Sequence, residues 1–149
     1  MRFCDCAKNS ATKDKTLAGM SNNAITFGEW RNIFCRCKAG SSAEKRALWR
    51  MMTLAKTFGD WLSVHTESLP YPKFRKFALK RLMALADDPV DMEAKKRDSL
   101  KVPRWTEILK ISDLDTVEEF IASQKVIHYM VAKKKSEKEL GHRDCSIKL

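Results

Sequence analysis

The cysteines are the residues whose type and spacing most directly suggest metal chemistry. Cys4 and Cys6 form one C-x-C pair, Cys35 and Cys37 form another, and such thiolates could bind zinc tetrahedrally. Structural zinc sites usually separate paired cysteines by about two to four residues, and cysteines two positions apart on a helix point roughly 200° away from each other. We therefore expect free thiols, no metal site and no resident cofactor.

Other chemistry has less support in the sequence. The 3 histidines are scattered, and neither a Gly-rich phosphate loop nor a paired-carboxylate motif is present, so we expect a protein that is not an enzyme. No apolar run approaches the roughly 20 residues that cross a bilayer. The first residues lack the apolar core of a secretory signal, and the 5 cysteines are an odd number, which favours a reducing intracellular compartment.

The charge of the chain points to an acidic partner. Lysine and arginine number 29 against 19 acidic residues, which gives a net charge of +10. The charge is uneven, because residues 41–86 contain nine basic and three acidic residues whereas residues 87–132 contain seven basic and ten acidic ones. The first of these segments should therefore provide the basic surface.

Eight of the nine basic residues of this segment lie in two clusters, Lys45 with Arg46 and Arg50, and then Lys73 to Arg81. An acidic protein is the partner that we favour. Nucleic acid is the alternative, because the same cations could neutralise phosphates, although the aromatic residues sit mostly at core spacing rather than among the cations. A peripheral membrane or matrix protein, held by its basic face and by acylated N-terminal cysteines, is a further alternative.

The element that must position the first cluster is the segment Ser41 to His65. Ser41 and Glu44 fit a capping box, in which each side chain accepts a backbone N–H at the start of a helix. Apolar residues then recur at spacings of three and four, which predicts one continuous amphipathic helix at the centre of the fold. These residues are Ala47, Leu48, Met51, Met52, Leu54, Ala55, Phe58, Trp61 and Leu62.

Two further helices flank this segment. Thr26 and Glu29 form a second capping box, and the helix that they begin should end at Gly40, since glycine suits a left-handed cap. The segment Lys73 to Ala86 predicts the next helix, which should present five cations: Lys73, Arg75, Lys76, Lys80 and Arg81. Its inward residues should be Phe74, Phe77, Ala78, Leu82 and Leu85.

The last third of the chain predicts shorter helices and then a long one. Asp88 and Pro89 suit the start of a weak surface helix that reaches about Ser99, and Pro103 should break the chain before a short apolar helix around Trp105. The segment Thr116 to Leu140 then predicts a long helix that ends at Gly141. Its inward residues should be Val117, Phe120, Ile121, Ile127, Met130 and Val131.

No alternating strand pattern occurs along the chain. We therefore predict an all-α, single-domain helical bundle with three long helices, shorter connecting helices and an extended N-terminal arm. The arm should occupy residues 1–24, the bundle residues 25–141 and a tail residues 142–149.

Leu48-Trp49-Arg50, preceded by Lys45 and Arg46, resembles the Leu-Tyr-Arg signature of the LYR-motif family of small mitochondrial proteins, with tryptophan in place of tyrosine. A second pattern of that family is similar in part to Lys76, Leu79, Lys80 and Met83. The resemblance implies a basic helical accessory subunit or assembly factor of a larger mitochondrial assembly, such as a respiratory complex. It also implies an acidic partner such as acyl-carrier protein.

The resemblance further implies which residues would serve such a partner. Docking would use Lys45, Arg46, Leu48, Trp49, Arg50, Lys76, Lys80 and Arg81. An interior lined by Met51, Met52 and Phe58 would accept an acyl chain carried on the partner's phosphopantetheine, because adaptable methionine side chains suit an irregular apolar guest. We therefore expect a non-enzymatic adaptor or accessory subunit that contributes no cofactor of its own.

Overall fold

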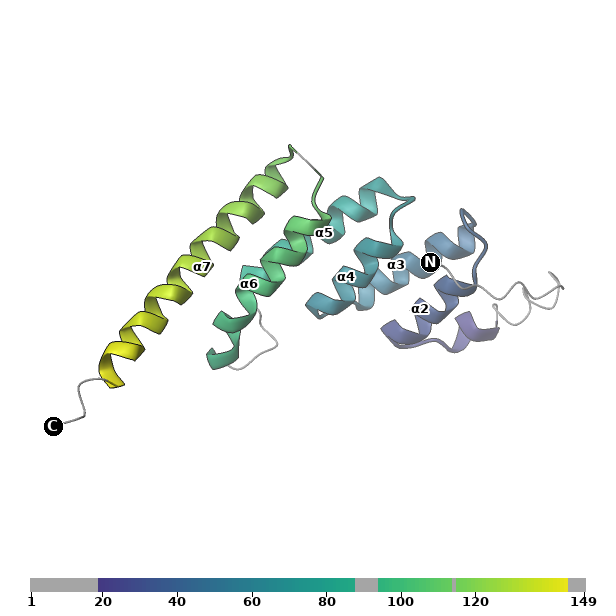
Figure 1. The fold of residues 1–149 in the computed structure, drawn as a ribbon. Coiled ribbons are helices and arrows are strands. Elements are labelled where there is room, and N and C mark those ends of the chain that lie inside the picture. The colour runs from purple at the N-terminus through teal and green to yellow at the C-terminus, as the bar shows by residue number, and fades with distance from the viewer. Residues whose placement is uncertain (1–18, 88–93, 114, 145–149) are drawn as a thin grey trace. The chain divides into compact units, whose positions relative to one another are not determined.

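The computed structural model describes residues 19–87, 94–113 and 115–144 (Figure 1). Within these residues the chain forms α-helices joined by short connections, and no strand occurs. The predicted all-α fold is therefore confirmed. The arm predicted for residues 1–24 lies outside the described residues as far as residue 18, and residues 19–23 are helical.

The chain divides into two compact units, one that reaches to Ala78 and one that begins at Leu79. The first unit contains α2 (Phe27–Arg36), α3 (Ser42–Leu54), α4 (Phe58–Glu67) and the start of α5 (Pro72–Asp87). The second unit contains the rest of α5 together with α6 (Ala94–Ile111) and α7 (Val117–Asp144).

In the first unit α3 packs against both α2 and α4. The predicted capping box at Thr26 and Glu29 is confirmed, with each side chain accepting the expected backbone N–H. The helix that it begins ends at Arg36 rather than at Gly40, because the chain turns extended at Cys37. The buried side chains of this unit include Trp30, Ile33, Phe34, Ala47, Leu48, Met51, Trp61 and Val64.

The continuous helix predicted over Ser41 to His65 is wrong, because the chain leaves the helical conformation at Ala55. A third capping box follows. The Thr57 hydroxyl accepts the N–H of Asp60, and the Asp60 carboxylate accepts the N–H groups of Thr57 and Lys56. These hydrogen bonds provide acceptors for backbone N–H groups at the start of α4. The break between α3 and α4 therefore leaves few backbone N–H groups without an acceptor. The apolar spacing continues across the break and therefore conceals it.

The start of α3 is held by Glu44, whose side chain is completely buried. Ser41 accepts the N–H of Glu44 as predicted, but the Glu44 carboxylate accepts the N–H of Gly40 instead of that of Ser41. The same carboxylate oxygen also accepts the hydroxyl of Tyr71 at 2.8 Å. Glu44 therefore joins the start of α3 to the residue that precedes α5.

The first turns of α5 complete this unit. Pro72 occupies the first helical position, where its missing N–H costs nothing. The ring of Phe77 meets that of Trp61 edge to face with centroids 5.7 Å apart, and Arg75 Nε donates to His65 Nε2 at 3.4 Å. The predicted helix is confirmed to within a residue at each end, although Phe77 is half exposed rather than inward.

In the second unit α6 and α7 form an antiparallel pair (Figure 1). The break predicted at Pro103 is wrong, because α6 continues through this residue. Pro103 is exposed, while Trp105 and Ile108 are buried, so their packing offsets the backbone hydrogen bond that proline lacks. The cap predicted at Asp88 and Pro89 lies outside the described residues.

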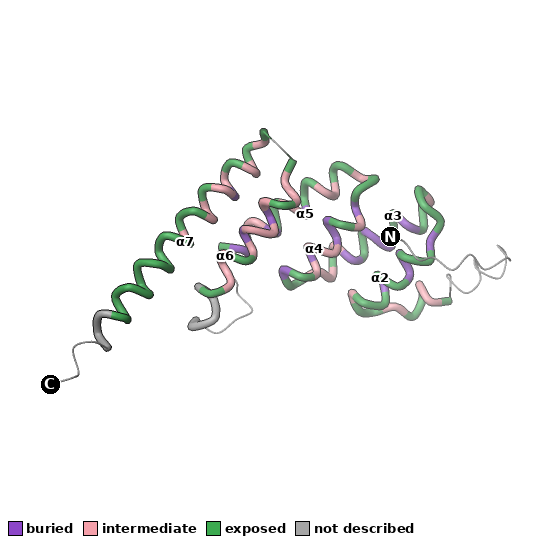
Figure 2. Tube along the Cα trace, viewed as in Figure 1, coloured by how far each residue is buried: buried purple, intermediate pink, exposed green. Residues whose placement is uncertain are grey.

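The buried side of α7 is not the side that the sequence predicts. It begins after Thr116, whose hydroxyl accepts the N–H of Glu119, and it continues through Gly141, which is not a cap. Ala122 is buried and Ile121 is half-buried. Five residues predicted to point inward are instead exposed, because α6 covers only one side of the helix (Figure 2). They are Val117, Phe120, Ile127, Met130 and Val131.

Candidate functional site

The residues of α3 that were predicted to bind a partner lie on its solvent-facing side. Lys45, Arg46, Trp49 and Arg50 are all exposed, and their spacing of three and four residues places them side by side on one face of the helix. We call this set the α3 surface. The opposite side of the helix is buried and comprises Glu44, Ala47, Leu48 and Met51.

The guanidinium of Arg50 lies near two aromatic rings, one on the α3 surface and one on α2. Its guanidinium carbon is 5.7 Å from the centre of the Trp49 ring and 5.9 Å from that of Trp30 on α2. Both distances are within the range of a cation–π interaction. Trp30 is buried, whereas 52% of Trp49 is exposed. The surface therefore presents a large apolar ring beside cations, and one of these cations lies within cation–π range of two rings.

The other residues predicted for α3 and α4 belong to the interior. Leu48 and Met51 have no exposed surface, Phe58 is buried and Met52 is half-buried. Leu48 therefore anchors α3 in the core, and its side chain does not take part in the α3 surface. An acyl chain could reach Met51 and Phe58 only if helices of the first unit moved apart, since these side chains are packed.

The predicted cations of α5 are exposed but lie on a helix other than α3. Lys76 and Lys80 are one turn apart on this helix, and Arg81 is adjacent. The boundary between the two units falls between Lys76 and Lys80. The structure therefore brings the four residues of α3 together, whereas Lys80 and Arg81 belong to the other compact unit.

Among the described cysteines, Cys35 is exposed and Cys37 is buried, and both are free thiols. Burial raises the pKa of the Cys37 thiol to about 11, with smaller contributions from Glu44 and Cys35. Within the described residues no three His, Cys, Asp or Glu side chains are grouped so that they could hold a metal ion. Cys4, Cys6 and Cys145 lie outside the described part of the chain.

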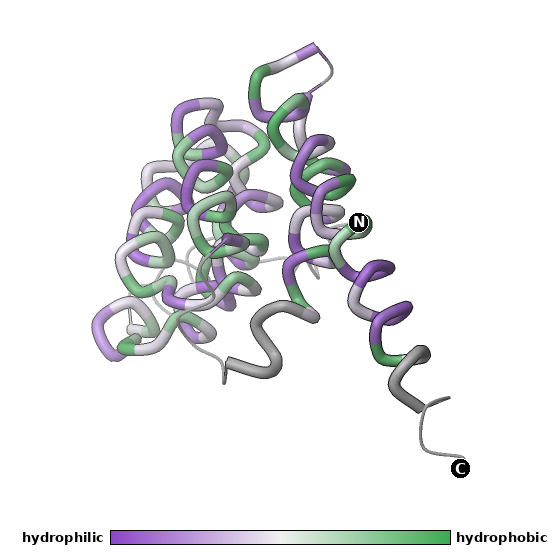
Figure 3. Tube along the Cα trace, turned by 90° about the vertical axis from the view of Figure 1, so that its left-hand side faces the viewer, coloured by the Kyte–Doolittle hydropathy of each residue, from purple (hydrophilic) through white to green (hydrophobic). Residues whose placement is uncertain are grey.

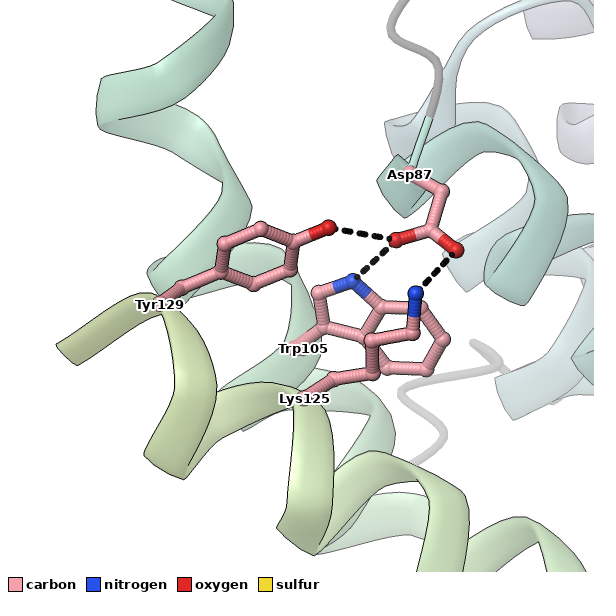
Figure 4. Close-up of polar contacts among 4 residues, drawn as sticks. All are labelled: Asp87, Trp105, Lys125 and Tyr129. Carbon is pink, nitrogen blue, oxygen red and sulfur yellow. Dashed lines mark hydrogen bonds and ion pairs between the residues drawn. The ribbon is translucent and has the colours of Figure 1, made fainter. Parts of the chain in front are cut away.

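A cluster in the second unit has no counterpart in the sequence predictions. Asp87, the last residue of α5, accepts hydrogen bonds from one side chain of α6 and two of α7 (Figure 4). Its Oδ1 accepts Trp105 Nε1 at 3.1 Å and the Tyr129 hydroxyl at 3.0 Å, and its Oδ2 accepts Lys125 Nζ at 2.9 Å. The sequence pattern predicts only that a helix ends at Ala86, since nothing in the sequence connects Asp87 with positions so far along the chain.

The electrostatics of this cluster indicate a structural role. Burial raises the pKa of Asp87, but the hydrogen bonds from Lys125, Tyr129 and Trp105 outweigh it and hold that pKa below its ordinary value. The hydrogen bond to Asp87 raises the pKa of Lys125, and burial together with the same carboxylate raises the pKa of Tyr129. Asp87, Lys125 and Tyr129 therefore keep their ordinary charge states at neutral pH. This suits a structural contact between helices and not proton transfer.

No protein-family model, curated protein or solved structure matches this chain. The described part of the chain also contains no helix that is both long and apolar enough to cross a membrane. Any function therefore has to follow from the residues of the described surfaces, and the α3 surface is one in which cations and a large exposed apolar ring coincide.

Proposed function

We propose that the protein is a non-enzymatic helical adaptor or accessory subunit that docks an acidic protein partner on the α3 surface. The observation that carries this proposal is the half-exposed Trp49 surrounded by Lys45, Arg46 and Arg50 on one helical face. Tryptophan and arginine are enriched among the residues that dominate binding energy at protein interfaces. Cations beside such a residue steer an acidic partner and orient it.

The contacts beneath this surface favour binding as well. The guanidinium of Arg50 already lies within cation–π range of Trp30 and Trp49, so it loses less side-chain freedom on binding than an unsupported arginine would. On the other side of the helix Leu48 and Met51 are fully packed, which keeps the face rigid. A preorganised surface of this kind is suited to a specific partner.

Acyl-carrier protein is the acidic partner that we propose, because Leu48-Trp49-Arg50 resembles the LYR-motif signature. A mitochondrial location belongs to the same proposal. Nucleic acid is the second candidate, and one observation favours it: Trp49 is exposed among cations, and such a ring can stack on a base.

Binding of acyl-carrier protein to single variants tests the first candidate. We expect Arg50→Glu and Trp49→Ala each to weaken binding by about tenfold or more, since each removes a central contact. Lys56→Glu is the matched control, because it makes the same change of charge at an exposed residue between α3 and α4. Titration calorimetry would measure all four proteins. Equal affinities for Arg50→Glu and the wild type would contradict the proposal.

Titration with single-stranded RNA at several salt concentrations separates the two candidates. Phosphate contacts make the logarithm of the affinity fall linearly with the logarithm of the salt concentration. RNA binding that has this dependence and is lost in Trp49→Ala, without binding of acyl-carrier protein, would replace the protein partner by nucleic acid. No RNA binding at low salt would remove the second candidate.

A further inference from the structure

Helix α7 carries an exposed row of apolar side chains that its packing against α6 does not use. Val117, Phe120, Ile127 and Val131 are 70%, 63%, 56% and 62% exposed. Together with Gln124 they are spaced three, four, three and four residues apart, which places all five on one side of the helix. We call these five residues the α7 stripe. Figure 3 shows hydrophobic segments alternating with hydrophilic ones along this helix.

The α7 stripe is distinct from the side of the helix that packs within the second unit. Ala122 is buried, and Lys125 and Tyr129 reach Asp87. By the 3.6-residue repeat, these three residues lie roughly 180° around the helix from the stripe. The helix therefore has one side that holds the unit together and an opposite side that is apolar and open.

The spacing and the size of the stripe favour a helical partner. A single exposed apolar side chain is ordinary on a protein surface, whereas a contiguous row indicates an interaction site. Alternate spacings of three and four residues are the pattern by which two helices pack along each other. Gln124 in the middle of the row is a polar residue of the kind that fixes register in such pairs.

The charged residues before and after the α7 stripe indicate which helix would pack against it. The residues at its start are acidic, and a run of exposed lysines follows the stripe. The acidic residues are Asp113, Asp115, Glu118 and Glu119, and the lysines are Lys133, Lys134 and Lys135. A second α7 in the antiparallel direction would bring each acidic group beside the three lysines of the other copy, whereas a parallel one would place like charges together. One helix thus carries both halves of a complementary pair.

We propose that two copies of this chain form a symmetric antiparallel dimer through the α7 stripe. The two-fold axis passes beside the middle of the stripe, between Gln124 and Ile127, so each residue pairs with the one at the same distance on the other side of this point. Phe120 then packs against Val131 of the partner subunit, and Gln124 packs against Ile127 of the partner subunit. Val117 then lies beside Lys134 of the partner subunit, close to the acidic start of the helix. The two-fold axis makes every contact occur twice, as in other symmetric dimers.

Sedimentation velocity of the full chain over a range of micromolar concentrations is the first test. We expect the wild type to form a dimer, and we expect the double variant Phe120→Glu with Ile127→Glu to weaken dimerisation by at least tenfold. Ala132→Glu is the control, because this exposed residue of α7 lies outside the stripe. Circular dichroism checks that each variant keeps its helices. A wild type that stays monomeric at every concentration, or a double variant that dimerises like the wild type, would overturn the proposal.

Zero-length crosslinking of carboxylates to lysines tests the direction of pairing on the unmodified chain. Glu119 and Lys133, the carboxylate and the lysine with the smallest separation between the two groups, are about 21 Å apart along one helix at 1.5 Å per residue, which is too far for such a link within one α7. Crosslinks between residues 113–119 and residues 133–135 must then join two copies. Mixing labelled with unlabelled chain would confirm this by mass spectrometry. Dimers without these crosslinks would overturn the antiparallel arrangement. Neither test uses a residue of the α3 surface, so their outcome is independent of the proposed adaptor function.

Discussion

At the scale of single residues, α3 divides its work between its two sides. Arg50 and Trp49 face solvent, whereas Glu44 and Leu48 have no exposed surface. A buried carboxylate is costly unless hydrogen bonds compensate for its lost hydration, and here Gly40 and Tyr71 each donate one. Glu44 thus fixes the start of the helix whose other side we propose as a docking surface, and its contribution can be measured.

We expect Glu44→Ala to lower the free energy of unfolding by about 3 kcal/mol, because it removes a buried carboxylate that accepts two partly buried hydrogen bonds. Tyr71→Phe removes one of these bonds and should cost about 1 kcal/mol. In the double variant the tyrosine substitution should cost almost nothing further, since its partner is already gone. Urea unfolding followed by circular dichroism would measure all three.

Glu29→Ala is the control for this experiment, because Glu29 makes similar capping bonds at an exposed site and should contribute less. Strictly additive losses for Glu44→Ala and Tyr71→Phe would show that the two side chains do not depend on each other. That result would contradict the contact between α3 and the start of α5.

The two described cysteines should differ strongly in reactivity. The thiolate is the reactive form, and a pKa of about 11 leaves roughly one thiolate in a thousand for Cys37 at pH 8. Cys35 is exposed. We expect iodoacetamide to modify Cys35 in the native protein and Cys37 only after unfolding in urea. Trypsin cuts after Arg36, so mass spectrometry of the two peptides separates them. Equal rates at both thiols in native protein would contradict the burial of Cys37.

At the scale of helices, local signals predicted the ends well only where no competing pattern was present. The capping box at Thr26 and Glu29 was found from sequence, and Thr57 with Asp60 is the same kind of signal. The second was missed because apolar residues continue at helical spacing on both sides of it. At Pro103 the error was the opposite one, a predicted break where the helix continues. The packing of the buried Trp105 and Ile108 stabilises α6 on the C-terminal side of this proline.

Apolar spacing also shows that a helix has an apolar side without showing what covers that side. The four apolar residues of the α7 stripe were predicted to point inward for this reason, whereas Ala122 is the residue of α7 that is buried in the second unit. The α3 surface was predictable, since cations at spacings of three and four lie within one segment. The contacts of Asp87 with Trp105 and Tyr129 were not, because they depend on how α5, α6 and α7 meet.

The cluster around Asp87 should make the second unit sensitive to acid. Its pKa is lowered in the folded protein, so its contribution is present above the unfolded value of about 3.9 and is lost as the pH falls through the folded value. We expect Asp87→Asn to cost about 1 kcal/mol at pH 7, because the site is partly exposed and solvent screens it. The difference from the wild type should shrink below about pH 4. Urea unfolding of the variant and the wild type at pH 7 and at pH 3 measures this difference in the free energy of unfolding.

Glu107→Gln provides the matched control, because Glu107 forms an exposed ion pair with Lys110, which lies one turn further along α6. Such surface pairs contribute about 0.5 kcal/mol or less. A loss for Asp87→Asn that is no larger than this, or one that is the same at pH 3 and pH 7, would show that the Asp87 cluster does not fasten the helices.

At the scale of the whole molecule, the two proposed surfaces belong to different compact units. The α3 surface lies in the first unit and the α7 stripe in the second. Each unit has buried side chains of its own, with Leu48 and Met51 in one and Trp105 and Ile108 in the other. Helix α5 contributes to both. Partner docking and self-association could therefore be altered separately by substitution.

Hydrogen exchange of the full chain should show whether the units also open separately. Proteins open in cooperative units, and a substitution accelerates exchange only in those openings that break its contacts. Asp87→Asn loosens contacts among α5, α6 and α7, so we expect faster exchange around Trp105 and Ala122 and unchanged exchange around Leu48. Glu44→Ala should do the reverse. If either substitution accelerated the slowest amides of both units equally, the chain would unfold as one cooperative body, because the lost free energy would then be shared by every buried amide.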